Sequence, residues 1–230
     1  MAWRGKTVKC HLCAESNNNF SMIKAVFLDF DGTLAATQIA TLAVYNELAE
    51  KHSLRPFTIE DIPMLRTLHW KDLISQCNVP VRSIPRLLKE GQKIIKGHMA
   101  YQSLCQDSIP DVLAQLRDEM PVIGIVSSNS KKNISIFLSA HNINMMDFVM
   151  TSPLFSKASK IAKALNKYSL SSDEALYVGD ELRDIYAARE AGTKVAAATW
   201  GFNAEELLVG ANPDFLIGNF TELLQIVGIT

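Results

Sequence analysis

Three aspartates in two short motifs have the types and spacing that a metal site needs. Asp29 and Asp31 stand two residues apart in Asp-Phe-Asp-Gly-Thr-Leu, and Asp180 lies in Gly-Asp-Glu-Leu-Arg-Asp. Carboxylates at positions i and i+2 of a strand lie on one face, where each raises the pKa of the other and costs stability unless a cation is bound. Mg²⁺ prefers oxygen ligands and keeps coordination sites for water and a substrate phosphate. The sequence therefore predicts a magnesium site at these three residues.

The same residues, with a hydroxyl and an ammonium group, could carry out phosphoryl transfer. One aspartate can attack phosphorus to form an aspartyl-phosphate, while a second acid protonates the leaving oxygen and later activates water. Ser127 follows an apolar run and Lys157 opens a helical segment, so both could stabilise the phosphoryl oxygens. Ser128 or Asn129 could share the task of Ser127, and Asp184 could simply cap the helix that follows Arg183.

Short apolar runs alternate with helical segments, and they place these residues. Strands that are apolar on both faces need helices on both sides of the sheet, which favours a doubly wound parallel α/β core. The functional residues follow the runs, and ligands of such sheets bind beyond the carboxyl ends of the strands. We expect strands at 25–30, 122–126, 148–150, 175–178 and 195–198, and helices at 111–119, 131–141, 157–167 and 184–191, with Gly192 as a helix C-cap.

The gap between the first two strands is too long for one crossover helix and predicts an inserted all-helical cap. Helical patterns cover residues 41–52, 71–77 and 84–101, and prolines punctuate them. We expect residues 37–105 to form this cap domain, with hinges near 33–37 and 105–111. Residues 22–36 and 106–230 would form the α/β core domain. The polar residues 1–21 show no periodicity and predict a flexible N-terminal extension.

Taken in order, these motifs resemble the four-motif signature of the haloacid dehalogenase superfamily. The matching segments are Asp29-Phe-Asp31-Gly-Thr-Leu, Ile125-Val-Ser127, Lys157 and Gly179-Asp180-Glu-Leu-Arg-Asp184. The resemblance covers about residues 23–228, and residues 177–192 are especially similar to the phosphoglycolate phosphatase-like branch, which has a helical cap. It implies a Rossmann-like core and a Mg²⁺-dependent phosphatase that hydrolyses a small phosphomonoester, with phosphoglycolate favoured, through an aspartyl-phosphate.

The resemblance also implies a role for each motif residue. Asp29 would be the nucleophile and Asp31 the general acid/base, and Lys157 would orient Asp29. The phosphate would be bound by Thr33, Ser127, Ser128, Asn129 and Lys157. The Mg²⁺ ligands would be the Asp29 side chain, the Asp31 backbone carbonyl and Asp180, with Asp184 supporting them.

Two positions depart from the usual pattern of this branch. Ala36-Thr37 stands where an acid and a serine are common, and no proline follows the lysine of the third motif. Lys160 lies one helical turn beyond Lys157, and we favour Lys157 because it stands nearer the strand end. In the cap, Arg66, His69 and Lys71 are candidates to read a distal anionic group of the substrate.

Three other functions share these motifs. A phosphomutase similar to β-phosphoglucomutase would use the same core but return the phosphoryl group to a sugar. A dehalogenase is disfavoured because Asp31 supplies an acid that halide displacement does not need. A catalytically silent binding protein would keep the fold, but the complete set of acids and the lysine gives no reason to infer lost chemistry.

Composition narrows the class of protein. The chain has 230 residues, 48% of them hydrophobic, a net charge of −1 and no apolar run long enough to span a bilayer. We therefore expect a soluble cytoplasmic monomer or homodimer that binds a small phosphorylated molecule, with no nucleic acid or membrane partner. Cys10 and Cys13 form only half of a zinc site, since no second ligand pair follows.

Overall fold

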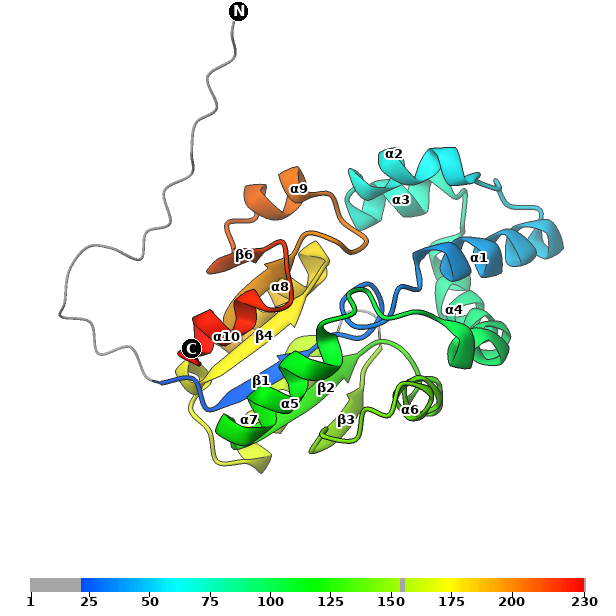
Figure 1. The fold of residues 1–230 in the computed structure, drawn as a ribbon. Coiled ribbons are helices and arrows are strands. Elements are labelled where there is room, and N and C mark those ends of the chain that lie inside the picture. Colours follow the sequence, from blue (N-terminus) through cyan, green and yellow to red (C-terminus); the bar gives the residue numbers. More distant parts are fainter. Residues whose placement is uncertain (1–21, 154–155, 230) are drawn as a thin grey trace, which may run out of the picture.

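A six-stranded, wholly parallel sheet forms the centre of the molecule. The structure is a computed structural model that describes residues 22–153 and 156–229. The strand order is β3-β2-β1-β4-β5-β6, so the chain starts in the middle and winds outward in both directions (Figure 1). The strands are β1 (Ala25–Leu28), β2 (Val122–Ser127), β3 (Phe148–Thr151), β4 (Ala175–Gly179), β5 (Lys194–Ala198) and β6 (Phe215–Ile217).

Helices cover both faces of this sheet, as expected for apolar parallel strands. Alternate residues of β1 enter separate cores: Val26 and Leu28 pack on one face, and Ala25 and Phe27 on the other. The helices α5 (Ile109–Glu119), α6 (Lys131–Ala140) and α10 (Glu222–Val227) line the first core. The second core is lined by α7 (Lys157–Lys167), α8 (Leu182–Ala191) and α9 (Glu205–Gly210), with the turn η4 (Ser172–Glu174) before β4.

A helical insertion between β1 and β2 forms a second unit beyond one end of the sheet (Figure 1). We call residues 38–101 the cap. The two segments that connect the cap to the sheet lie side by side, since Ala36 N donates to Ser103 O at 2.9 Å and Cys105 N donates to Leu34 O at 2.9 Å. The cap contains α1 (Gln38–His52), η1 (Ile59–Asp61), α2 (Ile62–Arg66), α3 (Trp70–Gln76), η2 (Val81–Ser83), α4 (Ile84–Ile95) and η3 (Lys96–Tyr101).

The architecture confirms the predicted doubly wound sheet and inserted helical cap. The sequence analysis missed β6, because its three residues are too few to show a pattern between Pro213 and Gly218. The helix expected over residues 84–101 changes at Lys96 to a 3₁₀ helix. Gly192 ends α8 with φ +79°, as expected of a helix C-cap.

One expectation lies outside the part of the chain that the structure describes, and one search gives a result within it. The expected extension at residues 1–21, with Cys10 and Cys13, lies outside the described residues. Within residues 22–153 and 156–229, no helix is long and apolar enough to cross a bilayer.

Candidate active site

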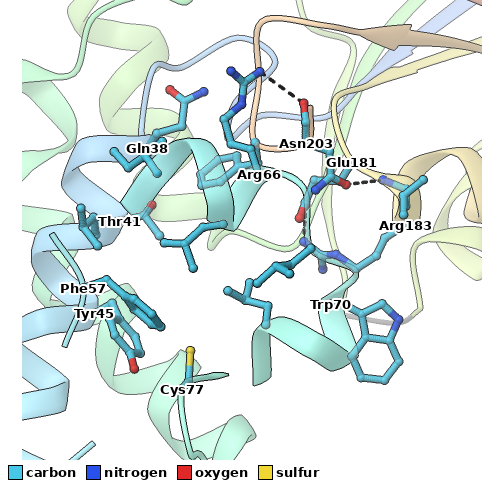
Figure 2. A pocket seen from close by; sticks show the side chains of 17 residues that line it. Gln38, Thr41, Tyr45, Phe57, Arg66, Trp70, Cys77, Glu181, Arg183 and Asn203 are labelled. Carbon is cyan, nitrogen blue, oxygen red and sulfur yellow. Dashed lines mark hydrogen bonds and ion pairs between the residues drawn. The ribbon is translucent and has the colours of Figure 1, made fainter. Parts of the chain in front are cut away.

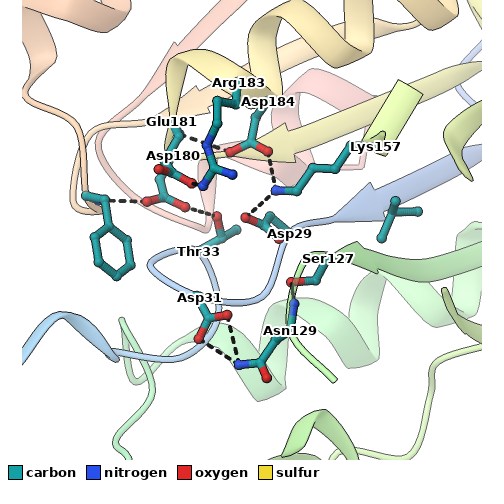
Figure 3. Close-up of polar contacts among 12 residues, drawn as sticks. Asp29, Asp31, Thr33, Ser127, Asn129, Lys157, Asp180, Glu181, Arg183 and Asp184 are labelled. Carbon is teal, nitrogen blue, oxygen red and sulfur yellow. Dashed lines mark hydrogen bonds and ion pairs between the residues drawn. The ribbon is translucent and has the colours of Figure 1, made fainter. Parts of the chain in front are cut away.

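The residues singled out in the sequence converge at the carboxyl ends of three neighbouring strands. Asp29 follows β1, Ser127 ends β2 and Asp180 follows β4. Because β1 lies between β2 and β4, the groups that follow those two strands flank Asp29 on opposite sides (Figure 3). The connection that leaves β1 runs to β2, and the connection that leaves β4 runs to β5 on the opposite side. Doubly wound sheets bind their ligands where the connections of neighbouring strands diverge in this way.

Lys157, the first residue of α7, is buried between two carboxylates. Its Nζ lies 2.7 Å from Asp29 Oδ2 and 2.5 Å from Asp184 Oδ1, and only 2% of its side chain is exposed. Burial lowers the pKa of Lys157, but the charges of Asp184 and Asp29 outweigh this and raise it above its ordinary value. The ammonium therefore stays charged and fixes one oxygen of Asp29.

Burial makes Asp29 a carboxylate of unusually high pKa. Desolvation, together with the charge of Asp184, raises its pKa to about 7 against the lowering effect of Lys157. Its second oxygen, Oδ1, is buried and has no hydrogen-bond partner among the described residues. A buried carboxylate oxygen without a donor is costly, so this atom is suited to a ligand that supplies positive charge.

Acidic groups outnumber cations around that oxygen. Asp29, Glu181 and Asp184 each offer a carboxylate oxygen within 4.8 Å of the others. Desolvation and the charges of Glu181, Asp184 and Asp29 raise the pKa of the neighbouring Asp180 well above its usual range. Oxygen donors of this kind and an excess of negative charge fit a hard cation such as Mg²⁺.

Asp180 uses both of its oxygens within the protein. Thr33 Oγ1 donates to Oδ1 at 2.6 Å, and the Phe202 amide donates to Oδ2 at 2.7 Å (Figure 3). The three acids that converge most closely are Asp29, Glu181 and Asp184. Ligation of a metal by Asp180 stays a prediction. The predicted phosphate contact of Thr33 likewise stays a prediction, since the structure shows its hydroxyl donating to Asp180.

Asp31 is joined to the cap by a chain of amide groups. Asn129 Nδ2 donates to both carboxylate oxygens of Asp31, at 3.1 and 2.9 Å, and Asn133 Nδ2 donates to Asn129 Oδ1 at 3.0 Å. Asn133 Nδ2 also lies 3.1 Å from the Gln92 carbonyl of α4, and Gln92 Nε2 donates to the Ser128 carbonyl at 2.8 Å. The position of Asp31 therefore depends on a helix of the cap as well as on the core.

The raised pKa of Asp31 suits a general acid. Burial raises the pKa of its carboxyl above the ordinary value, while hydrogen bonds from Asn129 and Thr37 limit the rise. Ser127 is fully buried, and its Oγ accepts a hydrogen bond from the Asn129 amide at 3.2 Å. The hydroxyl hydrogen of Ser127 is therefore available for another acceptor.

Two glycines leave room for the Asp180 carboxylate. A Cβ on Gly32 would lie 2.3 Å from Asp180 Oδ2, and a Cβ on Gly201 would lie 2.2 Å from Asp180 Cβ. Gly32 also has φ +78°, a conformation that other residues rarely adopt. The turn after β1 and the loop after β5 can therefore close around Asp180 only with glycine at both positions.

We expect Gly201→Ala to displace Asp180 and to lower both catalytic activity and stability. The added methyl group would overlap Cβ of the buried Asp180, which cannot move without its backbone. Overpacking of this kind typically costs about 1–3 kcal/mol. The matched control is Gly97→Ala, because a Cβ there meets no atom within 4 Å. Urea unfolding and turnover of both variants test this; equal behaviour of the two would contradict it.

The three cap candidates are not brought together. Arg66 reaches the core, where its Nη2 donates to Thr199 O at 3.0 Å and Asn203 O at 3.3 Å. Arg66 also lines a cavity between the cap and the core (Figure 2). His69 and Lys71 do not line this cavity, and Lys71 Nζ lies 5.6 Å from the Trp70 ring centroid instead. Of the three, Arg66 alone lines this cavity, and a role in substrate recognition stays a prediction for each of them.

The sequence analysis did not single out two residues beside Asp29. Glu181 and Arg183 form an ion pair with each other, and the charge of Arg183 acts on Lys157 at close range. Both belong to Gly-Asp-Glu-Leu-Arg-Asp, so their place in a motif was visible. The orientation of their side chains was not visible, because it depends on how α8, which Glu181 caps, is placed relative to the strands.

Comparisons with known proteins identify several relatives of this chain. The family model for haloacid dehalogenase-like hydrolases matches residues 26–198. The phosphoglycolate phosphatase of Synechococcus elongatus is 32% identical over 207 residues, which are 89% of this chain and 97% of that protein. Pyrophosphatase PpaX of Bacillus pumilus is 26% identical over 219 residues, covering 91% of this chain and 99% of that protein.

A solved structure shows the same fold. A haloacid dehalogenase-like family hydrolase from Streptococcus pneumoniae superposes with a TM-score of 0.72 at 21% identity. The superposition covers 89% of this chain and 98% of that one, so it includes both the sheet and the helical cap.

Proposed function

Because this chain belongs to the haloacid dehalogenase-like hydrolases, we propose that it is a Mg²⁺-dependent phosphatase of small phosphomonoesters. The observation that carries the proposal is the buried Asp29, held by Lys157 through one oxygen while its other oxygen has no partner among the described residues. The similarity to a phosphoglycolate phosphatase favours phosphoglycolate among known substrates of such relatives.

Asp29 would act as the nucleophile. One oxygen of its carboxylate attacks phosphorus, the phosphorus–oxygen bond to the leaving group breaks, and an aspartyl-phosphate forms. Lys157 lies 2.7 Å from Oδ2 and so fixes the orientation of the carboxylate as a whole. Mg²⁺ held by Asp29 with Glu181, Asp184 and Asp180 around it would offset the negative charge that carboxylates and phosphate bring together.

Asp31 would move the protons. Its raised pKa keeps a proton available for the leaving oxygen, and the resulting carboxylate can then activate the water that hydrolyses the aspartyl-phosphate. Asn129 donates to both oxygens of Asp31 and so holds its position through the two steps. The hydroxyl of Ser127 would donate to a phosphoryl oxygen as charge develops there.

Phosphate release from a panel of phosphomonoesters tests this function. The panel contains phosphoglycolate, sugar phosphates and nucleoside monophosphates, each with Mg²⁺ or with EDTA. We expect release with Mg²⁺ and at most a residual rate with EDTA. Isomerised sugar phosphate without free phosphate would instead identify a phosphomutase, and no reaction of a well-folded protein with any ester would contradict the proposal.

A further inference from the structure

We propose that the cavity between the cap and the core receives an apolar leaving group, so that the preferred substrates are phosphomonoesters with a small hydrocarbon body. This inference rests on the proposed phosphatase function and changes the substrate class, since an apolar body takes the place of the carboxylate-bearing leaving group of phosphoglycolate as the preferred one. The cavity lies between α1, α2 and α3 of the cap and, on the core side, the start of α8 at residues 181–183 and the loop at residues 202–203 (Figure 2).

The cavity reaches the edge of the acidic group beside Asp29. Glu181 and Arg183 line it, and Glu181 also belongs to the acidic group that includes Asp29. A phosphate placed at Asp29 would therefore have its ester oxygen directed toward either this cavity or solvent. The cavity measures about 210 Å³, less than the ~300–1,000 Å³ of sites for drug-sized ligands, so it fits a small body.

Its walls are mainly hydrocarbon. Apolar side chains from both the cap and the core face it. A polyol placed there would leave hydroxyl groups without partners, which costs free energy, whereas a hydrocarbon chain would gain it. The apolar lining residues are Leu42, Phe57, Ile62, Leu65, Leu68, Leu73, Leu182 and Phe202.

The polar groups around the cavity are largely committed to the protein. Gln38 Nε2 donates to Trp200 O at 3.2 Å, Tyr45 OH donates to Arg55 O at 2.5 Å, and Asn203 Oδ1 accepts from the Leu182 amide at 2.9 Å. Arg66 Nη2 is held by two carbonyls, and its buried Nε has no partner among the described residues. The cavity therefore offers few free places for a polar substrate.

A homologous series of alkyl phosphates tests the inference. Methyl, butyl and hexyl phosphate have nearly the same leaving-group chemistry, so a change of kcat/KM along the series reports on binding of the chain. We expect kcat/KM with Mg²⁺ to rise at least about tenfold from methyl to hexyl phosphate, and to be lower for glycerol 3-phosphate than for butyl phosphate.

Variants locate the effect in the cavity. Leu65→Asn should remove most of the gain for hexyl phosphate, and so lower kcat/KM far more for hexyl than for methyl phosphate. Leu42→Asn, on a different wall, should do the same, and thermal unfolding will show that both variants fold. The matched control is Leu88→Asn, since Leu88 is 40% exposed on α4 and does not line the cavity.

The possible results separate the cavity inference from the phosphatase function. Asp29-dependent hydrolysis with the same kcat/KM along the series would overturn the inference and leave the phosphatase function intact. If no ester is hydrolysed, calorimetry with hexylphosphonate and methylphosphonate separates the two proposals. Tighter binding of hexylphosphonate, lost in Leu65→Asn, would support the cavity without the function, and equal or absent binding would overturn both.

Discussion

Asp29→Asn should abolish phosphate release, with a fall in kcat of at least about 10⁴-fold. The amide retains the shape of the carboxylate but cannot serve as the nucleophile, so no aspartyl-phosphate can form. Lys157 keeps its bond to Asp184 in this variant, and the fold should therefore persist. Steady-state release of phosphate with Mg²⁺ measures the effect.

Trapping of the intermediate adds a second readout. Acid quenching with a ³²P-labelled substrate should leave label on the unaltered protein and none on Asp29→Asn. Asp111→Asn is the matched control, because Asp111 is exposed on α5 and belongs to none of the four motifs. Label on Asp29→Asn, or a loss of activity of less than tenfold, would show that another residue is the nucleophile.

Lys157→Met should weaken both folding and catalysis. Removal of the ammonium leaves Asp29 and Asp184 buried together without their shared cation, and breaking a buried pair in this way typically costs about 3–5 kcal/mol. The lowering effect of Lys157 on the pKa of Asp29 is lost too, so a smaller fraction of Asp29 is ionised at neutral pH. We expect the midpoint of urea unfolding to fall and kcat to drop at least about 10²-fold.

The sign of the pH dependence distinguishes this explanation from simple unfolding. Because the pKa of Asp29 rises further in Lys157→Met, the remaining activity should increase as the pH is raised above 7. Lys160→Met is the control and also decides between the two candidate lysines, since Lys160 makes no ion pair with Asp29 or Asp184. A greater loss in Lys160→Met than in Lys157→Met would assign the motif to Lys160.

Much of the fold follows from local patterns in the sequence. The apolar runs that became β1, β2 and β4 are buried on both faces, and this alone requires helices on both sides of a parallel sheet. Asp29, Ser127 and Asp180 come at the ends of those runs, so their convergence at one edge follows from the parallel direction of the strands. The strand β3 and the helix α7, which begins at Lys157, were predicted from the same alternation of apolar runs and helical segments.

The tertiary structure decided which side chains meet. Glu181 joins Asp29 and Asp184 because α8 begins at this edge of the sheet, and a sequence cannot show the direction of a helix relative to another strand. Asp180 turns toward Thr33 and Phe202 because glycines at 32 and 201 let two distant loops close around it. The amide chain from Asp31 to Gln92 and the apolar cavity both arise where the cap packs on the core. Such contacts join residues far apart in the chain, and their geometry depends on packing that no local pattern records.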